Sequence, residues 1–379
     1  MTANCRSKSI ASLLVLVAAS AVAQAQKPNA PAESVPVLLD AMARADDAGR
    51  RELRAALSLA AKSARSWPSF TAELEPARRA ARGPVLEVDL FRALGPYIER
   101  VEGSAQAFAA VARQQKDFRA RYLLLGPAAE LARTGDRAAL AWLGLSLRTD
   151  ADAHVRARAA EVSARVPELL PHLAVAAEDG EVRVRQAAAH SIGVIAANGD
   201  GRSGAPATTA AARNALVRRL RLDPWTFVRS GAARSLGALP AEAGADRSLA
   251  SAMADASPEV RMSAIDALGE HRAAAYAPAI REVMGATKQP GDVRISAVLA
   301  LATMCDRASI EAWTTMARRV ANPQGEQDLR LGVAAIAALG RVHPPDVAAR
   351  LAPVNVKGVP SSLRDVVRAA INSKGACPR

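Results

Sequence analysis

The sequence predicts an all-α protein in which short helical hairpins stack side by side into a solenoid. Hydrophobic residues make up 50% of the chain but aromatic residues only 3%, and the abundant alanine, leucine and arginine favour helix. A β-sandwich would need more β-branched and aromatic residues. A second observation is a motif that recurs along the last two thirds of the chain. Successive copies are separated by about the length of one helical hairpin, and such a period is typical of a repeat array.

The recurring motif is an apolar residue, an arginine, and then small and apolar residues at helical spacing. In the best copy, Val260, Ala264, Ala267 and Leu268 fall on one face of an α-helix. The arginines of successive copies are 29 to 44 residues apart. They are Arg156, Arg185, Arg229, Arg261, Arg294, Arg330 and Arg364. The widest interval contains a Gly-rich insertion at 198–206, which is a weak candidate contact loop.

An aspartate precedes the arginine by six residues in four copies. One interpretation is that the arginines form a stripe that binds anions. The other is a structural ladder in which the aspartates accept hydrogen bonds from arginines or backbone amides of adjacent repeats. The fixed position of the arginine favours the ladder. Its expected members are Asp150, Arg156, Asp179, Arg185, Asp223, Arg229, Asp255, Arg261, Arg294 and Arg330.

A second amphipathic helix is expected between successive motif helices, at 167–177, 211–222, 248–254 and 278–284. Gly193, Gly237 and Gly269 follow the apolar stripe, where we expect left-handed residues that end each motif helix. Such a hairpin cannot bury its apolar face alone, so neighbouring hairpins must stack.

The pattern of Asp, turn, Val-Arg, Ala and Ala-Leu-Gly resembles the HEAT family, specifically the short HEAT-like repeats of bilin-lyase-related proteins. The resemblance covers about residues 125–372. It implies an α-solenoid that serves as a scaffold or cargo binder and only rarely as an enzyme. The sequence departs from the family at Lys288, which replaces the leading aspartate, and in the last two copies.

The first 25 residues have the features of a secretory signal peptide. Arg6 and Lys8 precede an apolar stretch at 10–23, which is too short to span a bilayer comfortably, and small-x-small cleavage sites follow. We therefore expect a periplasmic or secreted protein without a membrane span after cleavage. The expected organisation is a signal at 1–25, degenerate helical repeats or a cap at 26–120, the solenoid at 121–372 and a tail at 373–379. A separate helical domain is the alternative for 26–120.

Two cysteines remain after cleavage, Cys305 and Cys377. Export to an oxidising compartment permits a disulfide between them if the tail folds back onto the last repeats. The alternative is two unpaired thiols.

No catalytic, cofactor-binding or metal-binding set is recognisable. The chain contains no H-E-x-x-H, Cys-x-x-Cys or G-x-S-x-G motif. A literal GxGxxG at 199–204 follows a helix instead of a strand, so we do not interpret it as a dinucleotide site. We expect no enzymatic activity and no cofactor.

The net charge of +13 favours an acidic partner. Arginines on the second helices are expected to line the concave face and to contact a protein partner. They are Arg218, Arg219, Arg221, Arg281, Arg318 and Arg319. The leading hypothesis is an exported, non-enzymatic scaffold. The alternatives are a polyanion-binding protein, with nucleic acid less expected because of export, and a HEAT-type enzyme or lyase. Trp142, Trp225 and Trp313 are expected to pack between repeats.

Overall fold

The computed structural model describes residues 35–63, 89, 93, 118–198 and 206–377. The predicted signal peptide, much of the predicted 26–120 region and most of the Gly-rich insertion lie outside these residues. The chain divides into two units, Met1–Ser104 and Ala105–Arg379. In the first unit, α2 (Val35–Arg44) packs against α3 (Asp47–Ser63).

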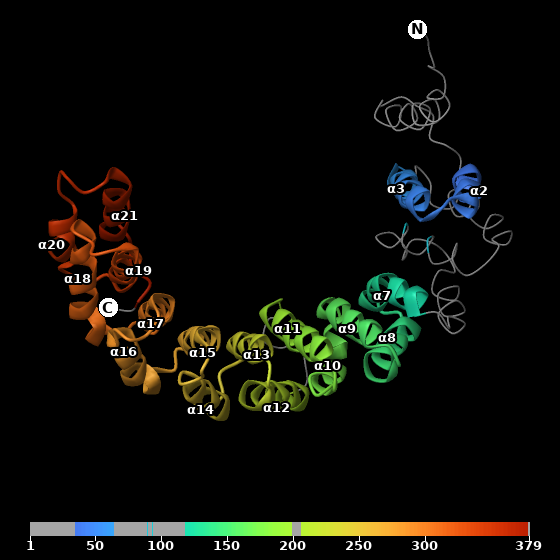
Figure 1. The fold of residues 1–379 in the computed structure, drawn as a ribbon, viewed down its shortest axis with the longest axis horizontal. Coiled ribbons are helices and arrows are strands. Elements are labelled where there is room, and N and C mark those ends of the chain that lie inside the picture. The colour runs from blue at the N-terminus through green and yellow to red at the C-terminus, as the bar shows by residue number, and fades with distance from the viewer. Residues whose placement is uncertain (1–34, 64–88, 90–92, 94–117, 199–205, 378–379) are drawn as a thin grey trace, which may run out of the picture. The chain divides into compact units, whose positions relative to one another are not determined.

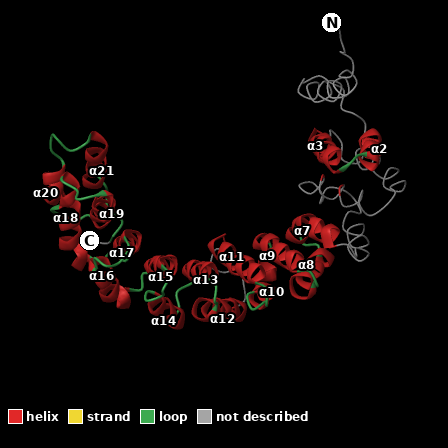
Figure 2. Cartoon of the chain, viewed as in Figure 1, coloured by secondary structure: helices red, strands yellow, loops and turns green. Residues whose placement is uncertain are grey.

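The second unit consists of helices that alternate between two rows (Figures 1 and 2). The first row contains α7 (Phe118–Arg133), α9 (Ala153–Val162), α11 (Val182–Asn198), α13 (Thr226–Ala238), α15 (Pro258–Glu270), α17 (Gly291–Thr303), α19 (Glu326–Val342) and α21 (Ser361–Ile371). The second row contains α8 (Arg137–Thr149), α10 (Leu170–Ala176), α12 (Pro206–Leu222), α14 (Ala243–Ala252), α16 (Ala277–Gly285), α18 (Ile310–Arg318) and α20 (Val347–Leu351).

Short 3-10 turns complete several connections: Ser163–Arg165, Pro167–Leu169, Ala274–Tyr276, Arg307–Ser309, Arg319–Ala321 and Ala352–Val354. The described residues form no β-strand, only an isolated bridge between Lys357 and Val359. The prediction of an all-α solenoid of stacked hairpins is confirmed.

The core lies between the rows and between neighbouring hairpins. The valine of each motif is fully buried, as Val184, Val228 and Val260 show. Successive first-row helices pack directly on one another, for example α13 on α11 and on α15. Because these contacts are made by small and branched side chains, each hairpin buries its apolar face against its neighbours.

The motif glycines serve this packing and do not end the helices as predicted. Gly193, Gly237 and Gly269 all lie inside first-row helices, and none has a positive φ. A Cβ on Gly237 would lie 2.9 Å from the Cα of Ala267 in the next helix, closer than real contacts allow. The glycine is therefore required for close approach of neighbouring helices.

The C-terminal tail folds back onto the last repeats, where Cys305 and Cys377 form a disulfide with Cα atoms 5.6 Å apart. The amide of Ala376 donates a hydrogen bond of 2.7 Å to the carbonyl of Arg341 at the end of α19. The hydroxyl of Ser373 donates to the carbonyl of Gly340 at 2.5 Å. One covalent bond and these two hydrogen bonds fix the tail to α17 and α19.

Candidate functional site

The recurring arginines and aspartates form a ladder along the edge where second-row helices turn into first-row helices. Arg156 donates from Nε and Nη2 to the two carboxylate oxygens of Asp179 at 2.8 and 2.9 Å. Its Nη1 donates to the main-chain carbonyl of Asp150 at 2.8 Å. Each arginine therefore joins the aspartate of the next repeat to the turn of its own repeat.

The same geometry repeats on both sides. Arg185 reaches Asp223 at 2.6 and 3.2 Å, and Arg229 reaches Asp255 at 2.9 Å through both nitrogens. Arg121 reaches Asp150 at 2.7 and 2.9 Å. The sequence analysis missed Arg121 because Ala120 precedes it in place of valine.

Each ladder aspartate also accepts the backbone amide two residues further on. Asp179 accepts from Glu181 at 2.8 Å, and Asp255 accepts from Ser257 at 2.8 Å. Burial alone would raise the pKa of Asp179, but Arg156 and the Glu181 amide lower it below its ordinary value. The pKa of Asp255 is lowered chiefly by its hydrogen bond from Arg229. Both oxygens of these two carboxylates accept hydrogen bonds from protein groups.

The ladder ends at Arg261. Its Nη1 donates to the carbonyl of Asp255 at 2.7 Å, but its buried Nε has no hydrogen-bond partner. The aspartate that would accept from it is replaced by Lys288. Arg294 is buried and donates from Nε to the carbonyl of Met284 at 2.9 Å. Burial and the nearby Arg319 lower the pKa of Arg294.

The prediction that Arg294 and Arg330 belong to the ladder is therefore wrong. In α19, Leu331 and Gly340 stand nine residues apart, like Val260 and Gly269 in α15, so Gly332 occupies the ladder position. Arg330 lies two residues too early. It is exposed and forms a surface ion pair with Asp292 at 2.5 Å.

The six arginines predicted to bind a partner lie on or directly after second-row helices. Figure 1 shows this row on the convex side of the second unit, so their predicted concave placement is wrong. The reason is the order within a hairpin: the Asp-Val-Arg helix lines the concave side and the helix before it lies outside. Four of the six also form ion pairs: Arg218 and Arg219 with Glu178, Arg281 with Asp306, and Arg319 with Asp328.

Arg221 and Arg318 are exposed and form no ion pair within the described part of the chain. Arg221 is next to a cluster of exposed apolar side chains. Leu222 is 68% exposed, Trp225 52% and Phe227 41%. The rings of Trp225 and Phe227 pair with centroids 5.6 Å apart. We call Arg221, Leu222, Trp225 and Phe227 the edge patch, because it lies at the α12–α13 turn beside the ladder.

The edge patch corrects the prediction that all three tryptophans pack between repeats. Trp313 is fully buried, whereas Trp225 lies in the turn after Asp223. Other repeats place polar residues at this position in the turn, such as Asp152, Glu181 and Ser257. That contrast was the signal in the sequence that Trp225 is not a core residue.

The residues that the structure describes contain no cluster of three or more His, Cys, Asp or Glu side chains able to hold a metal ion. Among the same residues, no helix combines the length and the apolar character needed to cross a membrane.

Two segments match models of known repeats. Residues 169–199 match the HEAT repeat, and residues 247–324 match HEAT repeats. The first match spans α10 and α11, a second-row helix followed by a first-row helix. No curated protein matches the chain in sequence.

Similar solved structures include Kap95 in a complex with Nup1, with a TM-score of 0.61 and 13% identity over 95% of this chain and 54% of Kap95. Importin beta gives a TM-score of 0.53 and 14% identity over 95% of this chain and 59% of that chain. This chain thus corresponds to little more than half of either protein. At these identities the likeness shows the fold alone.

The CpcE–CpcF complex of phycocyanin lyase from Nostoc sp. PCC7120 is less similar, with a TM-score of 0.35 and 18% identity over 70% of this chain and 94% of that chain. The finer resemblance to bilin-lyase-type repeats stays a prediction. The repeat matches identify HEAT repeats at 169–199 and 247–324, and the two rows of stacked hairpins have the architecture of a HEAT-like repeat array.

Proposed function

We propose that this chain is an exported scaffold that binds a protein partner through the edge patch and catalyses no reaction. The observation that carries the proposal is the exposed ring pair of Trp225 and Phe227. Only 3% of the residues in this chain are aromatic, and two of them lie side by side on the surface. Exposed aromatic clusters are typical of the centre of a protein–protein interface.

Charge beside the ring pair indicates what kind of partner fits. Arg221 directly precedes Leu222. Arg183 and Phe227 each precede the buried valine of their helix, and because α11 packs on α13, they lie at the same level of neighbouring helices. Neither Arg221 nor Arg183 forms an ion pair within the described residues. A partner segment with a large apolar side chain flanked by carboxylates would therefore complement the patch.

Export rests on the signal-like sequence at 1–25. The Cys305–Cys377 disulfide supports it, because such bonds persist in oxidising compartments and are rare in the cytosol. A periplasmic or secreted location is therefore part of the proposal.

The test is capture of a partner from cell-envelope extract by the purified protein, followed by calorimetry with the purified partner. The variant Trp225→Ala/Phe227→Ala should weaken binding about 1,000-fold, since two aromatic anchors that each contribute about 2 kcal/mol sum to about 4 kcal/mol. The control is Leu145→Ala/Val175→Ala, which removes apolar side chains of similar exposure from α8 and α10. Unchanged binding by the aromatic variant, or recovery of only a small molecule, would contradict the proposal.

A further inference from the structure

Three rungs of the ladder show how each arginine is oriented. A rung is one ladder arginine together with the aspartate of the next repeat. In the rungs of Arg156, Arg185 and Arg229, Nη1 donates to a main-chain carbonyl in the turn of the same repeat. Nε and Nη2 donate side by side to the carboxylate of the next turn, at 2.6–3.2 Å. The bonds at Nη1 thus fix the guanidinium as a fork that faces a carboxylate.

Arg261 has the same attachment but no carboxylate. Its Nη1 donates to the carbonyl of Asp255 at 2.7 Å and to that of Ala256 at 3.1 Å. The equivalent bonds of Arg229 measure 3.1 and 3.2 Å. The Nε of Arg261 is nevertheless buried without an acceptor, and Lys288 stands at the aspartate position of the next turn. We call Nε and Nη2 of Arg261 the Arg261 fork, because the same two atoms hold a carboxylate in the other rungs.

The charge around the α16–α17 turn is positive. Lys288 is exposed and forms no ion pair within the described residues. Arg294, the next motif arginine, is only 8% exposed and donates to the carbonyl of Met284 instead of to a carboxylate. Asp292, the acidic residue nearest to Lys288 in the sequence, pairs with Arg330 at 2.5 Å. Because buried arginine donors without acceptors cost free energy, an anion at this turn would stabilise the folded chain.

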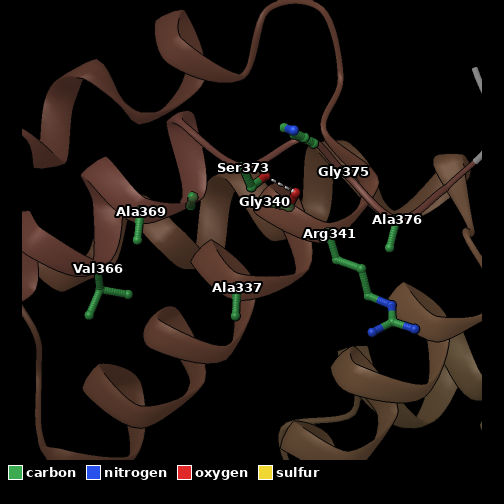
Figure 3. Close-up of a pocket in the computed structure, with 10 residues that line it drawn as sticks. Ala337, Gly340, Arg341, Val366, Ala369, Ser373, Gly375 and Ala376 are labelled. Carbon is green, nitrogen blue, oxygen red and sulfur yellow. Dashed lines mark hydrogen bonds between the residues drawn. The ribbon is translucent and has the colours of Figure 1, made fainter.

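The pocket at the C-terminal end of the array offers no comparable donor. It has a volume of about 370 Å³ and lies between α19, α21 and the tail (Figure 3). Its lining is mainly apolar, and none of the polar side chains in that lining is buried. A buried donor of fixed orientation therefore distinguishes the Arg261 fork from this pocket.

We infer that the Arg261 fork binds a carboxylate, which takes the position of the aspartate in the other rungs. The class of ligand follows from the chain itself, because three forks of the same orientation hold carboxylates. A phosphate would bring further oxygens that need donors. The other rungs supply a third donor through the amide two residues after the aspartate, but here that residue is Pro290, which has no N–H. A group with two oxygens therefore fits this turn better than a tetrahedral anion.

The carboxylate can come from an acidic side chain of a protein partner or from a free carboxylic acid. The fork faces the same edge of the array that carries the edge patch, two turns further toward the C-terminus. A partner on the edge patch can therefore place an Asp or Glu side chain in the fork. Carboxylate binding by the fork does not require the edge patch and is independent of the proposed function.

The test is a titration of the full mature chain, carrying isotope-labelled arginine, with sodium acetate at constant ionic strength. The Nε–H nuclear magnetic resonance signal of Arg261 should shift and saturate, with a Kd on the order of 10 mM. Arg156 already holds a carboxylate and should not respond, and the exposed Arg318 should respond only linearly up to about 200 mM acetate. Acetamide, which has the same shape without the charge, should shift none of these signals.

Two variants locate the site. Arg261→Lys keeps the charge but removes the fork, so the Arg261 signal and every saturable response should be lost while the circular dichroism stays helical. Lys288→Asp places a carboxylate on the chain, so the Arg261 signal should move toward that of Arg229 without acetate and stop responding to it. The matched control Lys357→Asp makes the same charge change outside the ladder and should keep the response.

Three results would overturn the inference: a linear response of Arg261, an equal response to acetamide, or an unchanged acetate response in Lys288→Asp. Phosphate binding with equal affinity would do the same, because it would show a general anion site.

The source of the carboxylate follows from the partner purified through the edge patch. If the partner supplies it, Arg261→Lys should bind that partner about tenfold more weakly. Unchanged partner binding, with the acetate response intact in the unmodified chain, assigns the fork to free carboxylic acids. The edge-patch variant Trp225→Ala/Phe227→Ala should keep the acetate response, so failure of the fork and failure of the proposed function can be told apart.

Discussion

The segment from α7 to α15 and the segment from α17 to α21 hold the same kind of hairpin in register by different means. In the first segment, charged hydrogen bonds run from repeat to repeat, from Arg121 to Asp255. In the second, the ladder is absent, and a disulfide joins Cys305 at the end of α17 to the tail beyond α21. We call these the ladder segment and the stapled segment.

In both segments, directional bonds supplement the stacking of neighbouring hairpins. The contacts between first-row helices are made largely by apolar side chains and are non-directional, with exceptions such as the hydrogen bond of 2.8 Å from the Ser191 hydroxyl to the carbonyl of Ala160. Bidentate arginine–carboxylate pairs add direction because both nitrogens must face both oxygens. Where Lys288 interrupts these pairs, a covalent bond between distant positions supplies the constraint instead.

The largest expected effect is at the most buried rung. The side chains of Arg185 and Asp223 are 8% and 0% exposed. Asp223→Ala leaves the Arg185 charge buried without its carboxylate, which costs about 3–5 kcal/mol. Asp292→Ala breaks the exposed pair with Arg330 and should cost about 0–1 kcal/mol. Hydrogen exchange should show the loss of protection in α11 and α13, and equal losses for both variants would contradict a structural ladder.

Removing the disulfide should destabilise the stapled segment and leave the ladder segment unchanged. The bond closes a loop of 72 residues, and its removal by Cys305→Ser/Cys377→Ser should cost about 2–4 kcal/mol. Hydrogen exchange in α19 and α21 is the measurement, because contacts in a repeat array stay local. An equal loss of protection in α9 and α11 would show that the two segments unfold as one unit.

A smaller effect is expected at the helix contacts that both segments share. Gly237→Ala places a methyl group 2.9 Å from backbone and side-chain atoms of Ala267 and should cost about 1–3 kcal/mol. Gly231 lies in the same helix with nothing within 4 Å of its Cβ position. Gly231→Ala should therefore stabilise the protein by up to about 1 kcal/mol. Thermal unfolding of the two variants should shift in opposite directions.

Acid should weaken the ladder segment before the stapled one. The folded pKa values of Asp179, Asp223 and Asp255 are lowered. Their contribution to the free energy of unfolding is complete above the unfolded pKa of about 3.9 and is lost as the pH falls through the folded values. Hydrogen exchange at falling pH, corrected for intrinsic rates, should show α11 and α13 losing protection first. Simultaneous loss in α19 and α21 would contradict this order.

The sequence predicted the rungs of the ladder because a fixed six-residue offset between aspartate and arginine reflects a fixed geometry. It assigned the concave face to the wrong row, because both helices of a hairpin carry the same period of apolar residues. It placed Arg330 in the ladder because it aligned Leu329 with the motif valine, although Gly340 follows two residues late in the sequence; the close packing of Gly340 on Ala370 identifies Gly340 as the motif glycine. Trp225 was assigned to the core because a large apolar residue is usually buried, and the sequence analysis did not place this residue in an exposed turn.

The smallest expected effect tests whether the ladder can be extended into the stapled segment. Lys288→Asp would offer a carboxylate to the unpaired Nε of Arg261. The ladder aspartates also accept an amide two residues further on, but here that residue is Pro290, which has no N–H. The single variant should therefore gain about 0.5–1 kcal/mol, less than a complete rung. Lys288→Asp/Pro290→Ser supplies the missing amide, as Ser257 does for Asp255. If the double variant gains no more than the single one in urea unfolding, the amide is not needed for a rung. If neither gains over the control Lys357→Asp, the α16–α17 turn holds residue 288 out of reach of Arg261.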